Sequence, residues 1–185
     1  MKKIILIALV AAFTKLNAQY GKGKMFPDMI AETFTEKPLN LPTDTKGKYT
    51  IIGMCFSKDA EGDIQTWLNP LYNAYVVKHE GNEAFGVAAT ADVNFYLMPK
   101  FSLLNQVFEK GSKNKIKDQT DKAFWPNLMF YTSGLKDYKK QLEIAETSQP
   151  VIFILDKTGK IVHYERGVCN EKKLSAIDDV VNTEE

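Results

Sequence analysis

The sequence predicts a single α/β domain in which a mixed central sheet is flanked by helices. Apolar strands and amphipathic helices alternate along the chain, which is the pattern of a layered α/β structure. Tyr49 to Phe56 is almost continuously apolar, as expected for a strand that is covered on both faces. With 185 residues, 44% of them hydrophobic, the chain can build a core of ordinary size.

The N-terminus has the pattern of a secretory signal peptide. Two lysines precede the apolar run of residues 4–13, which is too short to span a bilayer comfortably. Cleavage after Ala18 would divide the chain into a signal peptide (1–18) and a domain (19–185). An uncleaved N-terminal anchor is the alternative. We therefore expect a periplasmic or secreted protein.

Cleavage also changes the charge balance. The full chain has 24 basic and 23 acidic residues, and the first 18 residues hold three lysines and no acid. The mature chain would therefore carry 21 basic residues against 23 acidic ones, a net charge of −2. This balance gives no electrostatic reason to expect nucleic acid or an anionic membrane as a partner. No later segment is apolar enough to span a membrane. The expected partner is another envelope or secreted protein.

The first third of the domain predicts a hairpin and one core strand. Residues 20–27 have the composition of a flexible lead-in. Met29–Phe34 and Pro38–Pro42 are expected as short extended segments, restricted to edge positions by their prolines. Thr43–Lys48 is expected to be a turn. The core strand, Tyr49–Phe56, follows it.

A single helix with a kink at Pro70 is expected next. Asp59 is a plausible N-cap for it. Its apolar side chains recur at helical spacing and form one stripe. They are Ala60, Ile64, Trp67, Leu68, Leu71, Tyr72 and Tyr75.

The middle of the chain predicts two more strands and two more helices. The strands are expected within Glu83–Thr90 and at Asn127–Thr132. The helices are expected at Met98–Lys110 and Leu135–Ile144, each with one apolar face.

The segment from Ser148 to Gly167 is the most informative feature of the chain. Pro150 enters an apolar strand, the turn Asp156-Lys157-Thr158-Gly159 follows, and a second strand ends at Gly167. A helix over Glu171–Val181 closes the domain.

Several of these segments together resemble the thioredoxin-like superfamily, in its peroxiredoxin-like branch, over residues 25–182. The matching pieces are Phe26-Pro27, Leu39-Asn40-Leu41-Pro42, Gly47-Lys48-Tyr49-Thr50, Pro70, Gln149-Pro150 and the turn from Leu155 to Ile161. Within the superfamily the chain is most similar to the mitochondrial ATP-synthase assembly factors. The resemblance implies a thioredoxin-like fold with an N-terminal β-hairpin extension. It also implies a cis-proline at Gln149-Pro150.

The redox motif of that superfamily is missing. The resemblance places reactive thiols at the start of the first core helix, where the helix end lowers a thiol's pKa. In one register these positions hold Ala60 and Asp63, and in the other Gly62 and Gln65. Neither register supplies a cysteine, and the Thr-x-x-Cys site of peroxiredoxins is absent as well. We therefore expect no dithiol–disulfide exchange of the usual kind.

Cys55 and Cys169 are the two cysteines of the chain. Cys55 lies within the core strand, where a cysteine usually acts as a small apolar residue. Cys169 begins the last helix and could have a lowered pKa. The resemblance puts the two on strands separated by another strand, too far apart for a disulfide. No catalytic residue is assigned, and Cys169, then Cys55, are the candidates.

Two segments are candidates for binding another protein. In redox relatives the backbone before the proline docks an extended peptide, which points to Gln149 and Pro150, although a fold-defining turn explains them as well. Phe124-Trp125 follows a polar stretch and could be an exposed anchor. The two histidines, His79 and His163, have no partners at metal-site spacing. We therefore expect no metal and no cofactor.

Two functional hypotheses follow. The first is an exported thioredoxin-like protein without the Cys-x-x-Cys site that binds or helps to assemble another protein. The second is a single-cysteine thiol oxidoreductase or peroxidase that uses Cys169, or less readily Cys55. The balance favours a protein that is not an enzyme.

Overall fold

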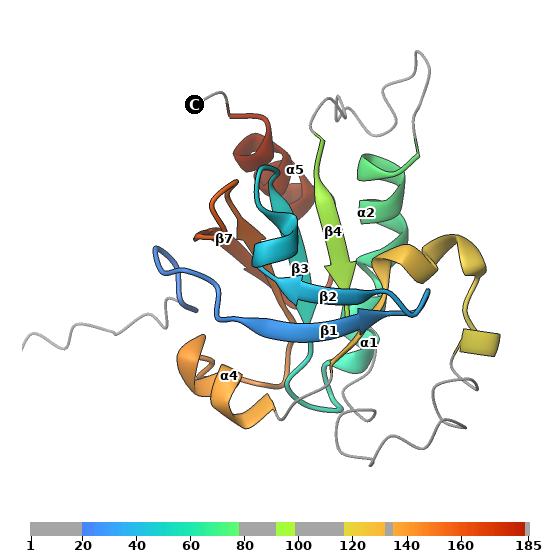
Figure 1. Cartoon of the computed structure of the whole chain (residues 1–185), viewed down its shortest axis with the longest axis horizontal. Coiled ribbons are helices and arrows are strands. Elements are labelled where there is room, and N and C mark those ends of the chain that lie inside the picture. The colour runs from blue at the N-terminus through green and yellow to red at the C-terminus, as the bar shows by residue number, and fades with distance from the viewer. Residues whose placement is uncertain (1–19, 78–91, 99–116, 132–134, 184–185) are drawn as a thin grey trace, which may run out of the picture.

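The computed structural model describes residues 20–77, 92–98, 117–131 and 135–183 (Figure 1). The strands are β1 (Met29–Thr33), β2 (Pro38–Leu41), β3 (Thr50–Met54), β4 (Asn94–Leu97), β5 (Met129–Tyr131), β6 (Val151–Leu155) and β7 (Ile161–Arg166). The helices are η1 (Thr43–Thr45), α1 (Glu61–Gln65), α2 (Leu68–Tyr75), η4 (Lys122–Asn127), α4 (Leu135–Gln141) and α5 (Glu171–Val181).

The central sheet has the order β4-β3-β6-β7 and is mixed. β3 pairs in parallel with β4 and antiparallel with β6, and β6 pairs antiparallel with β7. All five residues of β3 and of β6 are buried, because both strands are covered on both faces. The predicted α/β class with a mixed central sheet is therefore confirmed.

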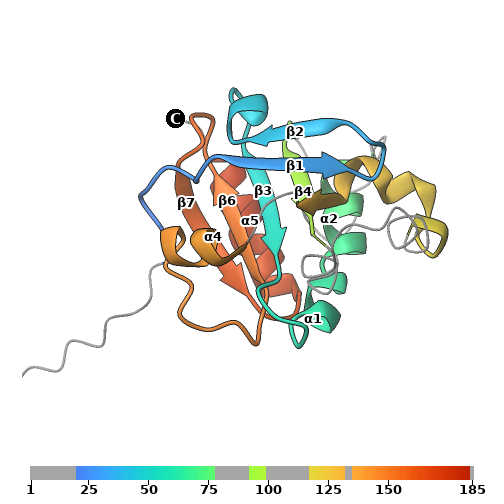
Figure 2. The same cartoon turned by 60° about the horizontal axis from the view of Figure 1, so that its bottom comes forward.

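Alternate side chains of the central strands feed two separate cores. Val151, Phe153 and Leu155 face the hairpin β1–β2 and the end of α4, whereas Ile152 and Ile154 face α1, α2 and α5. Figure 2 shows these layers, with α4 and the hairpin in front of the sheet and α2 and α5 behind it. The sheet is thus the middle layer of three.

The hairpin β1–β2 is antiparallel, with Met29 opposite Leu41, and β1 also pairs with β5. A parallel bridge between Leu97 and Leu128 connects this small sheet to the central one. The predicted N-terminal hairpin is confirmed, and so is the predicted strand that contains β5.

Residues 20–27 are not a flexible lead-in, so that expectation was wrong. Tyr20 and Phe26 are buried. The backbone N–H groups of Gly23 and Phe26 donate to the carbonyls of Ile161 and Gly159, at 2.8 and 2.9 Å. The segment therefore lies against the start of β7 and provides hydrogen-bond partners for backbone groups of Gly159 and Ile161. The glycines and lysines of the segment do not predict this long-range pairing.

The expected kinked helix is two helices. The break lies between α1 and α2, ahead of Pro70, because proline has no N–H for the carbonyl four residues earlier, that of Thr66. Asp59 is not the N-cap of α1, which begins after Ala60 without a side-chain cap. The Glu61 N–H donates to the Lys58 carbonyl at 3.1 Å in the turn before the helix, and the first helical bond runs from the Ile64 N–H to the Ala60 carbonyl at 3.2 Å.

Three predictions fall outside the described residues. These are the signal peptide, the strand within Glu83–Thr90 and, apart from Met98, the helix Met98–Lys110. Among the described residues, the parallel neighbour of β3 is β4, for which the sequence offers no prediction. The predicted helix Glu171–Val181 coincides with α5. Within the described ranges, no helix has the length and apolarity to cross a membrane.

Candidate functional site

Three loops meet at one end of the central sheet. They are the loop between β3 and α1, the segment between α4 and β6, and the turn between β7 and α5. The Ser57 hydroxyl donates to the Thr147 carbonyl at 2.6 Å, which joins the first two. The backbone N–H of Gly167 donates to the Pro150 carbonyl at 3.2 Å, which joins the last two. We refer to this end of the sheet as the loop end.

The turn between β7 and α5 is also bonded to the break between α1 and α2. The indole N–H of Trp67 donates to the Gly167 carbonyl at 2.7 Å, and the N–H of Cys169 donates to the Thr66 hydroxyl at 2.8 Å. From the other side, the Lys173 ammonium donates to the Val168 carbonyl at 2.7 Å. Backbone carbonyls that would otherwise lack partners are thereby satisfied, and the turn is held on two sides.

Gln149 and Pro150 lie at the loop end, directly before β6. Pro150 is buried, whereas Gln149 is exposed and packs beside Gly167. The expected cis bond at Gln149-Pro150 was wrong, because the cis peptide bond of the described chain is Leu41-Pro42. Pro150 instead continues directly into the extended ladder of β6.

The start of α1 is the place where the thioredoxin-like resemblance implies reactive cysteines, and here it holds other residues. Ala60, the residue that precedes α1, is fully buried, and its carbonyl accepts a hydrogen bond from the Cys55 thiol at 3.4 Å. Burial, together with the smaller effect of the Glu61 and Asp63 carboxylates, raises the pKa of the Cys55 thiol to about 12. Cys55 therefore acts as a small buried residue with a weak donor and is protonated at neutral pH.

Cys169 is half-buried, two residues before α5. Burial raises the pKa of its thiol to about 11, although the Lys173 ammonium acts in the opposite direction. A thiol with this pKa is almost entirely protonated at pH 7, and the thiolate is the reactive form. Both cysteines are free.

The structure does not bring Phe124 and Trp125 to the loop end. They lie in η4, which contacts β4 and β1, whereas Pro150 precedes β6 on the other side of β3. Both are half-buried. Phe124 packs edge-on against Tyr72, with ring centroids 4.8 Å apart, and the Trp125 indole donates to the Thr120 carbonyl at 3.1 Å. Their packing inside the domain explains both aromatic side chains.

Sequence reasoning missed one residue of the loop end, Arg166. Its guanidinium lies over the ring of Tyr20, 4.9 Å from the centroid, and its Nε and Nη2 atoms are enclosed without a hydrogen-bond partner among the described residues. Nothing in the sequence around Arg166 indicates that its guanidinium is enclosed or that it packs on an aromatic ring. The partner ring also comes from the segment that the sequence assigned to a lead-in.

The described residues offer no cluster of three or more His, Cys, Asp or Glu side chains that could hold a metal ion. The groups that the loop end presents include the exposed amide of Gln149, the half-buried thiol of Cys169 and the guanidinium of Arg166.

The family model described as ATP10 protein matches residues 14–183 of this chain, which is nearly the whole of it. None of the curated protein sequences matches.

Solved structures with the same fold include proteins described as a thiol-disulfide oxidoreductase and a peroxiredoxin. The thioredoxin domain of a thiol-disulfide oxidoreductase from Bacteroides vulgatus superposes with a TM-score of 0.57 at 20% identity, over 87% of this chain and 98% of that one. A thiol:disulfide interchange protein from Bacteroides sp. gives 0.51 at 18% identity, over 88% and 91%. A 2-Cys peroxiredoxin from Plasmodium vivax gives 0.52 at 16% identity, over 86% and 96%. At these identities the similarity establishes a thioredoxin-like fold.

Proposed function

Because this chain belongs to the ATP10 protein family and has the thioredoxin-like fold, we propose that it is an exported assembly module, which binds another protein at the loop end without thiol chemistry. The family match over residues 14–183 carries the proposal, because the sequence resembles assembly factors with a degenerate thioredoxin fold. The partner is a protein of the cell envelope or a secreted protein.

The geometry of the loop end supports a binding role. Three loops are bonded to one another there, so the backbone around Gln149 is held in place before a partner arrives. Preorganisation of this kind lowers the entropy lost on binding. The exposed side chains of Gln149 and Val168 lie on this surface, Val168 being 47% exposed. An amide and an apolar group suit an extended polypeptide better than a small anion.

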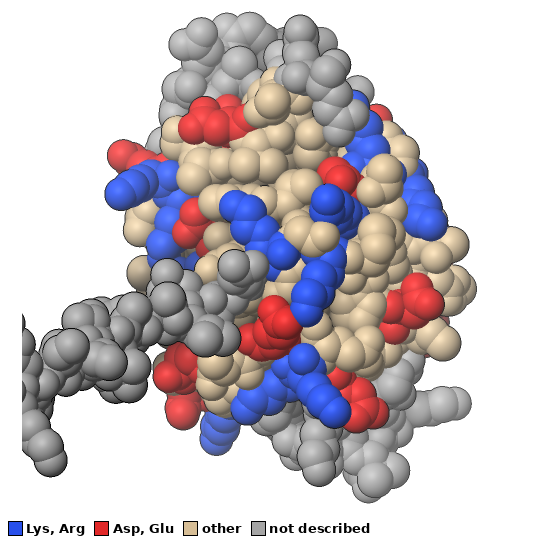
Figure 3. All heavy atoms as spheres, turned by 90° about the vertical axis from the view of Figure 1, so that its left-hand side faces the viewer, with Lys and Arg blue, Asp and Glu red and all other residues tan. Residues whose placement is uncertain are grey.

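The charge distribution also fits a protein partner. Figure 3 shows the side of the molecule at the left of Figure 1, where basic and acidic side chains are interspersed with uncharged surface. A single-sign patch, the usual footprint of nucleic acid binding, is not visible on this face.

The raised pKa of both thiols counts against the single-cysteine enzyme. A catalytic cysteine needs a low thiol pKa and an exposed sulfur. The thiol pKa of both Cys55 and Cys169 is raised, and neither residue is fully exposed. The proposal therefore assigns the two cysteines to packing.

Replacing both cysteines separates the two hypotheses. We expect the Cys55→Ala, Cys169→Ser double variant to restore assembly of the affected envelope complex in a deletion strain, as judged by native gel electrophoresis. Its fold is checked by circular dichroism beforehand. Loss of assembly with the folded Cys169→Ser single variant would instead support thiol chemistry.

Position-specific cross-linking tests where the partner binds. A photo-reactive amino acid at Gln149 should give a discrete adduct in the cell, whereas the same group at Lys157, in the exposed turn between β6 and β7, should not. Equal adducts from both positions would contradict binding at the loop end. The mass of the purified chain tests export, since removal of residues 1–18 leaves Gln19 as the first residue.

A further inference from the structure

Met25 differs from the other methionines of the folded domain in its exposure. The sequence contains six methionines, and all except Met1 lie in the described residues. Met25 is 52% exposed, whereas the other four are at most 1% exposed. These four are Met29, Met54, Met98 and Met129. A buried thioether is shielded from dissolved oxidants, so exposure leaves one methionine of the described chain open to them.

The backbone on both sides of Met25 keeps its side chain at the surface. Phe26, the next residue, is buried, and its N–H donates to the Gly159 carbonyl at 2.9 Å. On the other side, the N–H of Ile161 donates to the Lys24 carbonyl at 2.9 Å. Successive side chains of an extended segment point to opposite sides. Because Phe26 occupies the core position, Met25 is directed outward.

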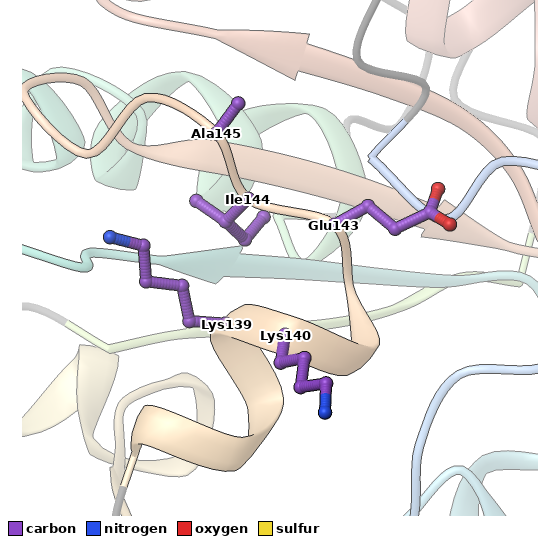
Figure 4. Close-up of a pocket in the computed structure, with 5 residues that line it drawn as sticks. All are labelled: Lys139, Lys140, Glu143, Ile144 and Ala145. Atoms are coloured by element: carbon purple, nitrogen blue, oxygen red, sulfur yellow. The ribbon is translucent and has the colours of Figure 1, made fainter.

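An ion pair fixes the chain directly before Met25. The Lys24 ammonium donates to the Glu143 carboxylate, which also accepts a hydrogen bond from the N–H of Gly21. Glu143 borders a pocket of about 310 Å³, whose other lining residues are Lys139, Lys140, Ile144 and Ala145. In Figure 4 the carboxylate of Glu143 points away from both lysines of this pocket. Glu143 thus holds the N-terminal segment beside the end of α4.

The methyl end of the Met25 side chain lies beside Gly159, in the turn between β6 and β7. A Cβ atom at Gly159 would lie 3.4 Å from Met25 Cε and 2.7 Å from the Cβ of Pro42, so the absence of a side chain there leaves room for both neighbours. This contact covers one end of the thioether, and half of the residue remains in contact with solvent.

The two thiols are poorer reaction partners for a peroxide at neutral pH. A cysteine reacts as its thiolate. Cys55 is fully buried, and burial raises the pKa of the half-buried Cys169 to about 11, although the Lys173 ammonium acts in the opposite direction. A thioether has no proton to lose, so its sulfur lone pair is available at any pH.

We propose that Met25 is an oxidation site that takes up one oxygen atom from a peroxide. The sulfur lone pair attacks one peroxide oxygen, the O–O bond breaks and an S–O bond forms. With hydrogen peroxide, the second oxygen leaves as water and takes up both protons. The sulfur is oxidised by two electrons and the peroxide is reduced by two, which gives methionine sulfoxide.

The reverse step needs a reductant from outside the chain. Reduction of the sulfoxide takes two electrons and two protons and releases water, which is the reaction of the thiol-dependent methionine sulfoxide reductases. One folded chain therefore consumes one peroxide at Met25, and a reductase of that class must restore it. The turn beside Met25 follows β6, whereas the loop end precedes it, so this site is independent of the proposed binding function.

Peroxide titration of the purified folded protein tests the proposal. We expect hydrogen peroxide at pH 7 to add one oxygen atom per chain, counted apart from Met1. Fragmentation of the tryptic peptide 25–46 should place the oxygen on Met25 and not on Met29. The variant Met25→Leu should lose the uptake and the matched control Met29→Leu should keep it, and both replacements nearly conserve side-chain volume.

The pH dependence separates the thioether from the thiol. The rate of oxygen uptake at Met25 should be the same at pH 6 and pH 8. A reaction at Cys169 would instead accelerate about tenfold per pH unit, because the pKa of its thiol lies above this range. The variant Cys169→Ser should leave the uptake at pH 7 unchanged.

Four results would overturn the proposal. They are the absence of oxygen from Met25 when the same peroxide oxidises free methionine, oxidation of Met29 as fast as Met25 in the folded protein, undiminished uptake in the folded Met25→Leu variant, and uptake at pH 7 that disappears in Cys169→Ser. The last of these would favour the single-cysteine enzyme. Cross-linking at Gln149 judges the proposed binding function separately.

Discussion

The indole N–H of Trp67 donates a hydrogen bond of 2.7 Å to the carbonyl oxygen of Gly167, which is 100 residues further along the chain. Both groups are buried, so water cannot replace either partner. This bond attaches the turn between β7 and α5 to the start of α2, and it is one of the contacts that give the loop end a fixed shape.

Removing that donor should be costly. The substitution Trp67→Phe keeps an aromatic ring but leaves the Gly167 carbonyl buried without this partner, and we expect a loss of about 1–3 kcal/mol in the free energy of unfolding. Denaturant titration measures it. The matched control is Trp125→Phe, because the half-buried Trp125 donor can be replaced by water more readily. A larger loss for Trp125 than for Trp67 would contradict this account.

Gly167 itself should not tolerate a side chain. Its φ angle is +70°, and a Cβ atom there would lie 3.4 Å from the side chain of Gln149. Because the contact with Gln149 is an ordinary van der Waals distance, the cost comes from the positive φ, and we expect Gly167→Ala to destabilise the domain by about 1 kcal/mol or more. Gly62→Ala is the control, since nothing lies within 4 Å of that position and alanine favours a helix. Denaturant titration of both variants measures the difference, and an equal stability of the two would contradict the prediction.

Thiol reactivity should be slow at neutral pH and should rise with pH. With a pKa of about 11, Cys169 is about one part in ten thousand thiolate at pH 7, and its reaction with a chromogenic disulfide should speed up about tenfold per pH unit. Cys55 should react more slowly still. The variants Cys169→Ser and Cys55→Ser assign the two phases. A fast reaction at pH 7 that disappears in Cys169→Ser would restore the enzyme hypothesis.

The same shift has a consequence for stability. Because the pKa of Cys169 is raised in the folded state, its contribution is fully present below the ordinary value of 9.0 and is lost as the pH rises toward 11. Unfolding midpoints of wild type and Cys169→Ser should therefore converge over this range. Parallel curves would show that the thiol does not titrate there.

Asp156 should make the stability of the domain depend on pH in the opposite direction, with a loss at low pH. Partial burial favours its neutral form, but hydrogen bonds from Thr158 and Lys160 outweigh burial and hold the pKa below the ordinary 3.8. A lowered pKa means that the stabilisation is present above that value and is lost as the pH falls below it. Asp156→Asn should thus be less stable than wild type at pH 7, and the difference should shrink below about pH 4. Thermal unfolding at both pH values measures the difference, and a constant gap would contradict the prediction.

Local patterns were sufficient for much of the fold. The helix Glu171–Val181, the strand at β3 and the turn at Asp156 follow from hydrophobic periodicity and turn chemistry, and the structure has all three. The pairing of residues 23–26 with β7 could not be foreseen, since it joins segments more than 130 residues apart and leaves no periodic signal. The break between α1 and α2 was foreseen as a kink and placed slightly late.

The candidate site was predicted less completely. The predicted strand entry at Gln149 and Pro150 agrees with β6, but the other candidate segment, Phe124-Trp125, lies on the far side of β3. Sequence order alone gives no distance between two loops of a layered fold. Arg166 was missed because its unusual state depends on what Tyr20 and Glu146 do around it, and not on the residue type.

The hydrogen bonds along β2 and β7 also bear on how the protein behaves when concentrated. The N–H of Asn40 in β2 donates to the Asp44 carboxylate at 2.7 Å, and the N–H of Ile161 in β7 donates to the Lys24 carbonyl at 2.9 Å. Outermost strands with unused backbone groups recruit strands from other molecules and seed aggregates. Here the chain itself supplies a partner for a backbone N–H group on each of the outer strands β2 and β7. These bonds disfavour self-association through the two strands in a crowded compartment.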